Sequence, residues 1–220
     1  MSVLITGASG GLGTAVCKAF LETGATVIGV ARTWTEAVSF LTLSVDLTTA
    51  EGCDAMVAQA LEHGPIEALV HLLGGFGGGQ PIAVTSDRTW DGIMALNLRA
   101  AFCAMRAVLR PMTEAKYGRI VAVGSRAAVE PMPNFAGYAV SKAALVALVK
   151  NVAAETKDLG ITANVVLPST IDTPLNRQAM PKSDFSRWVT PESIAKNLVW
   201  LASREAGEVS GAVIPIYGRA

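Results

Sequence analysis

Short apolar runs alternate along this chain with longer stretches in which apolar residues recur at helical spacing. The short runs are SVLIT, ATVIGVA, SFLTLSV, IEALVHLL, RIVAVGS and TANVVLP. The helical stretches include LGTAVCKAFLET and AALVALVKNVAAET. Runs that are apolar throughout predict strands covered on both faces, and this cover requires helices that cross between parallel strands. The pattern therefore predicts an α/β fold: a doubly wound parallel sheet of about seven strands with helices on both faces.

Residues that begin and end elements agree with this division. Gly24 follows the first helical stretch, where a left-handed residue closes a helix. Thr48 and Glu51 have the spacing of a capping box and predict the start of the second crossover helix. The last apolar run, GAVIPIYG, contains Pro215, whose missing N–H suits an edge strand. We expect one domain over residues 1–220.

Composition narrows the class of partner. Of the 220 residues, 51% are hydrophobic and 16% are charged, which provides a core and excludes disorder. The 18 basic and 18 acidic residues cancel, so the chain lacks the basic surface of a nucleic-acid or anionic-membrane binder. The expected partners are small molecules or further copies of this chain.

Cysteines and apolar run lengths indicate the compartment. Cys17, Cys53 and Cys103 are an odd number, far apart and without a CxxC pair, so neither a disulfide framework nor a metal site is predicted. No uninterrupted apolar run approaches the ~18 residues of a membrane span, and no basic, apolar leader precedes the first strand. We expect a soluble cytoplasmic protein with no membrane partner.

A glycine-rich turn, VLITGASGGLG, joins the first strand to the first helix. Gly7 permits the sharp turn, Gly11 lets the backbone approach a pyrophosphate, and Gly13 permits close packing of helix on strand. A tight turn alone also favours glycine, but this one lies in a complete strand-helix-strand unit. The loop predicts a Rossmann-type dinucleotide site, and a P-loop is disfavoured because no Gly-Lys-Ser/Thr follows.

The end of the second strand bears on the choice of dinucleotide. An acidic residue there holds the ribose 2′-hydroxyl of NAD, whereas an arginine accommodates the 2′-phosphate of NADP. This chain has Ala31 followed by Arg32, which favours NADP, with NAD as the alternative. Arg32 could also be an ordinary solvated charge. Asp46, after the third strand, is assigned to the adenine; its other interpretation is a helix cap, which Thr48 already supplies.

Four features together resemble the short-chain dehydrogenase/reductase family. They are the opening TGxxxGxG, the pair Tyr138 and Lys142 in YAVSK, Ser125 thirteen residues earlier, and Asn97 in ALNLRA. The resemblance spans essentially the whole chain. It implies a nicotinamide cofactor, a water relay from Asn97 to Lys142, and a second role for Lys142 in holding the nicotinamide ribose.

The chemistry of these residues supports the same assignment. Tyr138 and Lys142 are four residues apart in a helical stretch, so both side chains can reach one ligand. A nearby ammonium lowers the pKa of a phenol, and we expect Lys142 to do this for Tyr138. Ser125 ends the fifth strand, where it can hold the oxygen that gains charge. Singly, each has a plain alternative: a helix residue, a surface lysine, a turn or a buried amide.

The resemblance completes the set of cofactor-binding candidates. Ile171 and Thr173, in the segment VLPSTIDTP, correspond to positions that meet the nicotinamide carboxamide. His71, in the fourth strand, is instead interpreted as a core histidine because no ligand partner is in view. The full set is Gly7, Ser9, Gly11, Leu12, Gly13, Arg32, Asp46, Leu47, Gly74, Tyr138, Lys142, Pro168, Ile171 and Thr173.

The stretch PLNRQAMPKSDFSRW shows neither helical nor strand period but is rich in large apolar residues. A long irregular connection beside a cofactor is typical of a lid, so residues 174–190 are predicted to cover a substrate and exclude water. The alternative is a loop that packs on its own domain or on a second subunit. The candidate substrate contacts in the lid are Leu175, Met180, Phe185 and Trp188.

Within the family, this stretch and the segment GGFGGG resemble dihydropteridine reductases. The resemblance implies a flat bicyclic substrate, a quinonoid dihydropterin, on which Phe76 could stack. Two residues depart from it: those enzymes generally lack the serine present here as Ser125, and they carry an acidic residue at the position of Ala31. The family's usual Asn-Asn-Ala-Gly is replaced here by HLLG.

The predicted function is an NAD(P)H-dependent oxidoreductase that transfers hydride to a C=O or C=N carbon, with Tyr138 as general acid/base. Pterin reduction is the sharper version, and a general ketone/alcohol dehydrogenase is the alternative. A rival of another class is a non-catalytic dinucleotide sensor, which would usually lack the tyrosine or lysine. Family members pair through the helices that carry Asn97 and Tyr138, which implies a homodimer or homotetramer.

Overall fold

The computed structural model describes residues 1–35 and 37–220, and within them seven parallel strands form one sheet in the order β3-β2-β1-β4-β5-β6-β7. This confirms the predicted fold class. Pro215 lies in β7 at the edge of the sheet, as its missing N–H predicted. The strands are β1 Ser2–Thr6, β2 Thr26–Ala31, β3 Leu41–Ser44, β4 Ala68–His71, β5 Gly118–Val123, β6 Ile161–Pro168 and β7 Val213–Ile216.

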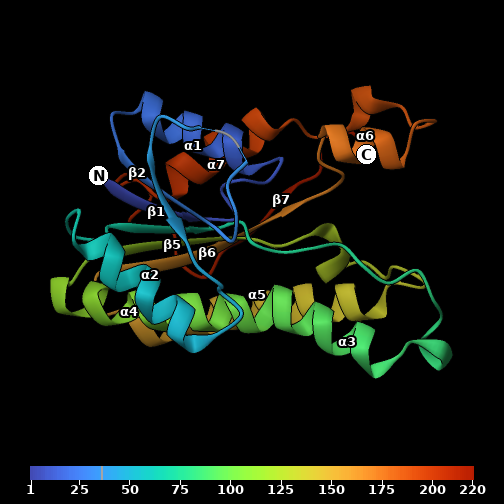
Figure 1. Ribbon diagram of the computed structural model, residues 1–220, viewed down its shortest axis with the longest axis horizontal. Coiled ribbons are helices and arrows are strands. Elements are labelled where there is room, and N and C mark those ends of the chain that lie inside the picture. The colour runs from blue at the N-terminus through green and yellow to red at the C-terminus, as the bar shows by residue number, and fades with distance from the viewer. Residues whose placement is uncertain (36) are drawn as a thin grey trace.

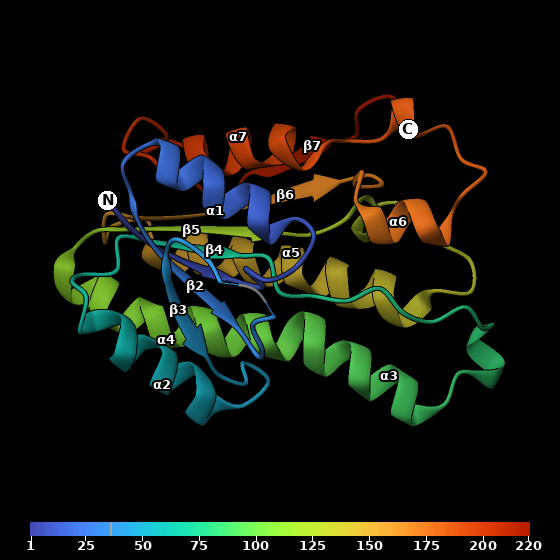
Figure 2. The same cartoon turned by 45° about the horizontal axis from the view of Figure 1, so that its top comes forward.

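Helices cover both faces of this sheet. In Figures 1 and 2, α2, α4 and α5 lie on one face, and α1 and α7 lie on the other. Short turns of 3-10 helix, η1 Ile82–Val84, η3 Arg126–Ala128 and η4 Phe185–Arg187, occupy the connections. The α-helices are α1 Gly13–Glu22, α2 Ala50–Leu61, α3 Asp87–Met94, α4 Ala100–Ala115, α5 Ala136–Thr156, α6 Pro174–Ala179 and α7 Pro191–Leu201.

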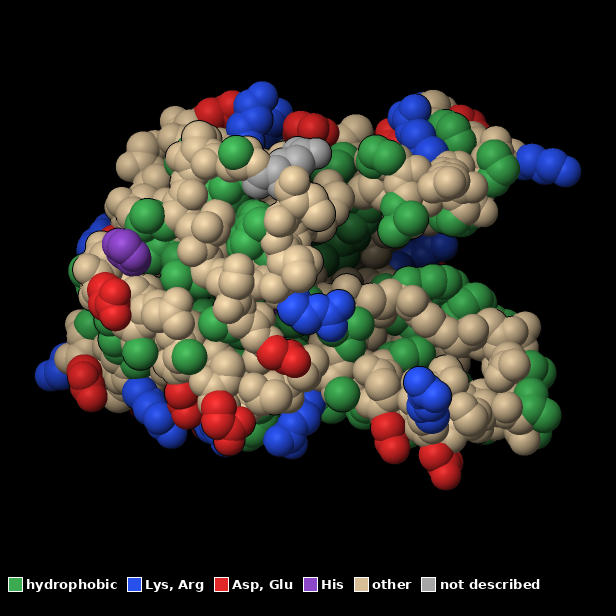
Figure 3. Space-filling view, viewed as in Figure 1, with side chains coloured by type: hydrophobic (Ala, Val, Ile, Leu, Met, Phe, Trp, Pro, Cys, Tyr) green, Lys and Arg blue, Asp and Glu red, His purple; other side chains and the backbone are tan. Residues whose placement is uncertain are grey.

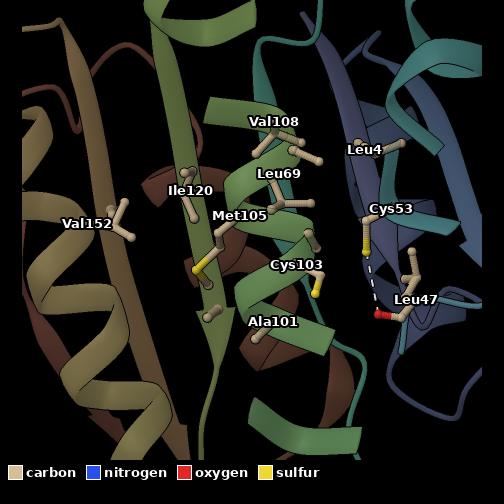
Figure 4. Packing of buried hydrophobic residues seen from close by; sticks show 14 of the residues in the cluster. Leu4, Leu47, Cys53, Leu69, Ala101, Cys103, Met105, Val108, Ile120 and Val152 are labelled. Atoms are coloured by element: carbon tan, nitrogen blue, oxygen red, sulfur yellow. Dashed lines mark hydrogen bonds between the residues drawn. The ribbon is translucent and has the colours of Figure 1, made fainter. Parts of the chain in front are cut away.

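The sheet separates two hydrophobic cores because successive strand residues point to opposite faces. Leu4 of β1 packs with Met105 and Leu145 in the core beneath α4 and α5. Part of this core is drawn in Figure 4. Its neighbours along the strand, Val3 and Ile5, pack on the other face with α1 and α7. The need to fill two cores explains why the strands are apolar throughout.

One helix runs from Asp87 to Ala115 through α3, a π-helical turn (η2, Ala95–Arg99) and α4. Among the described helices, it alone is long and apolar enough to cross a membrane by length and composition. Counting uninterrupted apolar runs misses it, because Arg99 and Arg106 interrupt the sequence. Its inner face is buried on the sheet, where Figure 4 shows Cys103 and Met105 in the core. It is a core helix.

The start of α2 differs from the prediction. Its N-cap is Thr49, whose side chain accepts a hydrogen bond from the Gly52 backbone N–H, and not Thr48. The Thr48 hydroxyl instead donates to Asp46 Oδ1, at 2.7 Å. Either threonine could have capped the helix by residue type, and the backbone path after Asp46 decides between them. Gly24 does take the predicted left-handed conformation, with φ +77°.

Candidate active site

The candidate site lies at the carboxyl edge of the sheet, where β1, β4, β5 and β6 end together. Figure 3 shows the molecule hollowed on this side, between the lobe that carries α6 and the lobe that carries α3. Hydrophobic side chains line the edges of both lobes where they face this cleft. Ligands of open parallel sheets bind at this edge.

The glycine loop packs so closely that side chains are excluded. Gly7 has φ +71°, and a Cβ there would lie 2.9 Å from the Leu73 backbone nitrogen. A Cβ on Gly13 would lie 2.5 Å from the Gly7 carbonyl oxygen. A Cβ on Gly11 would lie 3.2 Å from the Thr173 side chain, so the loop also touches the segment after β6. The structure therefore has the sharp turn at Gly7 and the close packing at Gly13, whereas the approach of Gly11 to a pyrophosphate stays a prediction.

The first turn of α1 fits a bound pyrophosphate. Its N-cap position is Leu12, which makes no side-chain cap, so no side chain occupies the first backbone N–H groups. These donors, together with the helix dipole, favour an anion. Ser9 is exposed in the same loop. The described residues thus fit a dinucleotide whose phosphates lie at this helix terminus.

Arg32 and Asp46 lie beside each other at the end of the second and third strands. Arg32 follows β2 directly and is exposed. Its charge contributes to lowering the pKa of Asp46, although hydrogen bonds from Thr48 contribute more. Asp46 Oδ1 accepts from both the backbone N–H and the hydroxyl of Thr48. The reason given for leaving Asp46 free for the adenine is therefore wrong, because Thr48 hydrogen-bonds Asp46 and does not cap α2. Leu47 is a buried core residue.

Tyr138, Lys142 and Ser125 come together from two elements. Tyr138 and Lys142 lie one turn apart in α5, and Ser125 follows β5 as the N-cap of η3. The Ser125 hydroxyl lies close enough to the Tyr138 phenol to favour its ionised form and so to lower its pKa. Lys142 is buried, and its Nζ donates to the Val123 carbonyl oxygen over 3.1 Å. Parallel-strand topology alone could not specify these contacts.

The pKa of Tyr138 differs from the expectation. Burial raises it above its ordinary value, and the hydrogen bond with Ser125 only partly offsets the rise. The predicted lowering by Lys142 is absent in this structure, because the ammonium is directed to the Val123 carbonyl. Burial also lowers the pKa of Lys142 to about 8, so Lys142 keeps its charge at neutral pH.

Asn97 connects the candidate catalytic residues to the glycine-rich segment. Its amide accepts from the Gly75 N–H at 2.8 Å and donates to the Gly75 carbonyl at 3.0 Å. It also donates to the Ser141 hydroxyl, which in turn donates to the Tyr138 carbonyl. A Cβ on Gly74 would lie 2.8 Å from Asn97 Oδ1 and 3.0 Å from Lys142 Nζ.

Two residues of this neighbourhood escaped the sequence prediction. Ser141 is buried between Asn97 and Tyr138, and Phe135 stacks on Phe76 at the base of α5. Both lie close in sequence to Tyr138, and that proximity is the signal that could have found them. Otherwise neither residue stands out in the sequence. A serine next to a lysine is common, and so is a phenylalanine in a turn.

His71 is buried, as predicted for a core histidine. Its Nδ1 lies 2.9 Å from the Thr6 hydroxyl, and its Nε2 has no hydrogen-bond partner among the described residues. Burial and the charge of Lys142 lower its pKa to about 3, so the ring is neutral at physiological pH. The three cysteines are also buried and unpaired in the described part of the chain, which contains no cluster of metal-binding side chains.

The stretch after β6 is more regular than predicted. Thr173 caps α6 and Pro174 occupies its first turn, a combination that typically starts a helix. Phe185 packs on Trp188, with centroids 4.8 Å apart, and Arg177 covers the Phe185 ring. Leu175 and Met180 are exposed. The apolar residues of this stretch thus divide into a pair that packs internally and a pair that faces solvent.

Comparisons with known proteins point to one family. The model of the short chain dehydrogenase family matches residues 1–184. The 3-oxoacyl-[acyl-carrier-protein] reductase MabA of Mycobacterium bovis is 30% identical over 226 residues, covering 99% of this chain and 91% of MabA. The short-chain dehydrogenase/reductase olcF of Penicillium canescens is 31% identical over 243 residues, covering 97% and 94%. The aldohexose dehydrogenase AldT of Thermoplasma acidophilum has a TM-score of 0.92 at 28% identity, covering 99% and 92%.

Proposed function

Because this chain belongs to the short-chain dehydrogenase/reductase family of oxidoreductases, whose fold binds a nicotinamide dinucleotide, we propose that it reduces a C=O or C=N carbon of a small molecule with NADPH. One observation carries the proposal. Tyr138 of α5 lies beside Ser125, which follows β5, at the edge of the sheet where ligands bind, and Lys142 of the same helix contacts the Val123 carbonyl of β5 over 3.1 Å.

In the proposed reaction, Tyr138 donates its proton to the oxygen or nitrogen of the reacting double bond. The phenol holds this proton at neutral pH, because burial raises a pKa that ordinarily already lies well above 7. Ser125 donates a hydrogen bond to the same atom as negative charge develops on it. Lys142, still an ammonium below its pKa of about 8, lies one helical turn from Tyr138, and turning its Nζ from the Val123 carbonyl toward the phenolate would stabilise the charge that remains. The nicotinamide, when bound, supplies the hydride.

Residues of the candidate site can be assigned to the individual groups of the cofactor. Gly7, Gly11 and Gly13, with the N-terminus of α1, would hold the pyrophosphate, and Lys142 the nicotinamide ribose. Arg32 supports the choice of NADPH over NADH, because an exposed guanidinium after β2 suits a 2′-phosphate. Asp46 is assigned to the adenine, Leu47, Gly74 and Pro168 to the cofactor's surroundings, and Ile171 and Thr173 to the carboxamide.

Two classes of substrate are proposed for this reaction. Reduction of a ketone is the broader proposal, and it accords with the name of the relative MabA, a 3-oxoacyl-[acyl-carrier-protein] reductase. Reduction of a quinonoid dihydropterin is the narrower one, favoured by the exposed Phe76 beside Tyr138. The relatives described above are not named as pterin reductases, so the pterin version depends on the site alone.

We further propose one domain with a lid at residues 174–190, acting in the cytoplasm as a homodimer or homotetramer. An apolar groove on the outer face of α3 and α4, lined by Met94, Leu98 and Phe102, supports pairing through these helices. Size-exclusion chromatography with light scattering gives the number of copies. A monomer at micromolar concentration would contradict the assembly.

The test of the reaction is oxidation of NADPH and NADH, followed at 340 nm, with a panel of ketones and quinonoid dihydropterin. We expect turnover with NADPH to exceed turnover with NADH. Turnover of ketones alone would reject the pterin version. Tight cofactor binding with no turnover of any substrate would favour the non-catalytic sensor instead.

A further inference from the structure

Two phenylalanines form a stacked pair beside the proposed proton donor. The Phe76 and Phe135 rings lie 4.7 Å apart between centroids, at an interplanar angle of 30°. The Phe76 ring also meets the Tyr138 ring edge-on, with centroids 5.0 Å apart. Phe76 nevertheless keeps 63% of its surface exposed. An aromatic ring left this exposed beside a reacting group offers a binding surface to a ligand.

The backbone holds Phe76 in place from both sides. On one side, both polar groups of the Gly75 backbone are bonded to the Asn97 amide. On the other, the N–H groups of Gly79 and Gln80 donate to the Asn134 carbonyl over 2.8 and 3.0 Å. Asn134 turns its carbonyl toward them in a left-handed conformation, φ 69°, which asparagine tolerates. A ring positioned before the ligand arrives loses little freedom on binding.

We propose that Phe76, supported from behind by Phe135, determines substrate specificity by selecting a planar, conjugated ring attached to the reacting carbon. An aryl ketone or a ring-conjugated imine has this form. The inference rests on the proposed function, because it uses Tyr138 to locate the reacting atom.

The position of the ring follows from the reach of the proton donor. Proton transfer needs a hydrogen bond of about 2.6–3.2 Å between Tyr138 and the reacting atom. A group one bond from that carbon then lies near the aromatic ring that touches Tyr138. A flat ring can place its whole face on Phe76, whereas a puckered saturated ring cannot. Aromatic pairs contribute enough to change a rate ratio about 2- to 12-fold.

The experiment compares acetophenone with cyclohexyl methyl ketone, which share a carbon skeleton and differ in ring planarity. The ratio of their kcat/KM values is measured for the wild type and for Phe76→Leu, Phe135→Leu and Phe76→Tyr. Phe40→Leu is the matched control, since Phe40 precedes β3 at the other end of the sheet and packs edge-on against Trp34. Taking a ratio within each variant cancels changes in folding and in cofactor binding.

We expect the ratio to fall about 3- to 10-fold in Phe76→Leu, less in Phe135→Leu, and to be unchanged in Phe76→Tyr and Phe40→Leu. An unchanged ratio in Phe76→Leu overturns the proposal. If the ratio is unchanged but the oligomeric state of this variant changes, Phe76 belongs instead to an interface between copies. If neither ketone reacts, the proposed function is decided separately, by the panel of ketones and quinonoid dihydropterin. The proposal is then judged by the ratio of dissociation constants of 1-phenylethanol and 1-cyclohexylethanol in the presence of NADP, with the same criteria.

Discussion

The two halves of the cleft are built in opposite ways. In the cofactor half, backbone packs on backbone: a Cβ on Gly7 or Gly13 would overlap main-chain atoms, and the strands behind them are buried. In the substrate half, large apolar side chains remain in solvent, with Leu175 73% exposed and Phe76 63% exposed. The first half leaves no room for variation in side chains, whereas the second consists of side chains that can vary. This difference supports the proposal that the first half holds the cofactor common to the family and the second a particular substrate.

Tyr138→Phe, at the junction of the two halves, should have the largest effect. Loss of the proton donor is expected to lower kcat about 10²- to 10⁴-fold. Cofactor binding, measured by titration of NADPH fluorescence, should stay within about twofold because the ring and the buried Lys142 remain. Turnover equal to that of the wild type would remove Tyr138 from the mechanism.

Gly13→Ala tests the backbone packing of the cofactor half. The added Cβ would lie 2.5 Å from the Gly7 carbonyl oxygen and would also overlap that of Ala8. We expect a loss of about 1–3 kcal/mol in the free energy of unfolding, and cofactor binding weakened by about tenfold or more as the loop shifts. Thermal unfolding and calorimetric titration measure the two effects.

Gly92→Ala is the matched control for this substitution. Gly92 lies in α3, and a Cβ there would meet nothing within 4 Å. Alanine is favoured over glycine in a helix by roughly 0.5–1 kcal/mol, so this variant should be slightly more stable. If Gly13→Ala and Gly92→Ala have equal free energies of unfolding and equal cofactor affinities, the tight packing at Gly13 contributes to neither.

Arg32→Asp tests the edge of the cofactor half, where side chains begin to matter. A charge-assisted hydrogen bond to a phosphate is replaced by repulsion, so the NADPH/NADH ratio of kcat/KM should fall about tenfold or more. Arg88→Asp makes the same charge change at an exposed position in α3 and should leave this ratio unchanged. A proportional loss with both cofactors would mean that Arg32 does not contact the 2′-phosphate.

Leu175→Ala should have the smallest effect, and only on the substrate half. Because Leu175 is exposed, the unfolding temperature should stay within about 1 °C. KM for an apolar ketone should rise about two- to fivefold if α6 covers the substrate. Phe185→Leu is the contrast within the same segment: Phe185 packs on Trp188, so its loss should lower stability more than it raises KM. An unchanged KM in Leu175→Ala would contradict a lid.

The sequence determined the architecture and the cofactor half because both depend on local rules. Short apolar runs such as SVLIT, bounded by turn residues, predict strands covered on two faces, and Gly7 and Gly13 mark positions where a side chain does not fit. The i, i+4 spacing of Tyr138 and Lys142 likewise placed them on one helical face.

Tertiary structure decided which groups face one another. Lys142 bonds the Val123 carbonyl, Thr49 and not Thr48 caps α2, and Phe76 meets Phe135 across 59 residues of chain. Burial, and not the neighbouring ammonium, sets the direction of the Tyr138 pKa. These outcomes depend on desolvation and on hydrogen-bond partners from distant segments. Local periodicity carries no information about either, because each arises only once the sheet has brought its strand ends together.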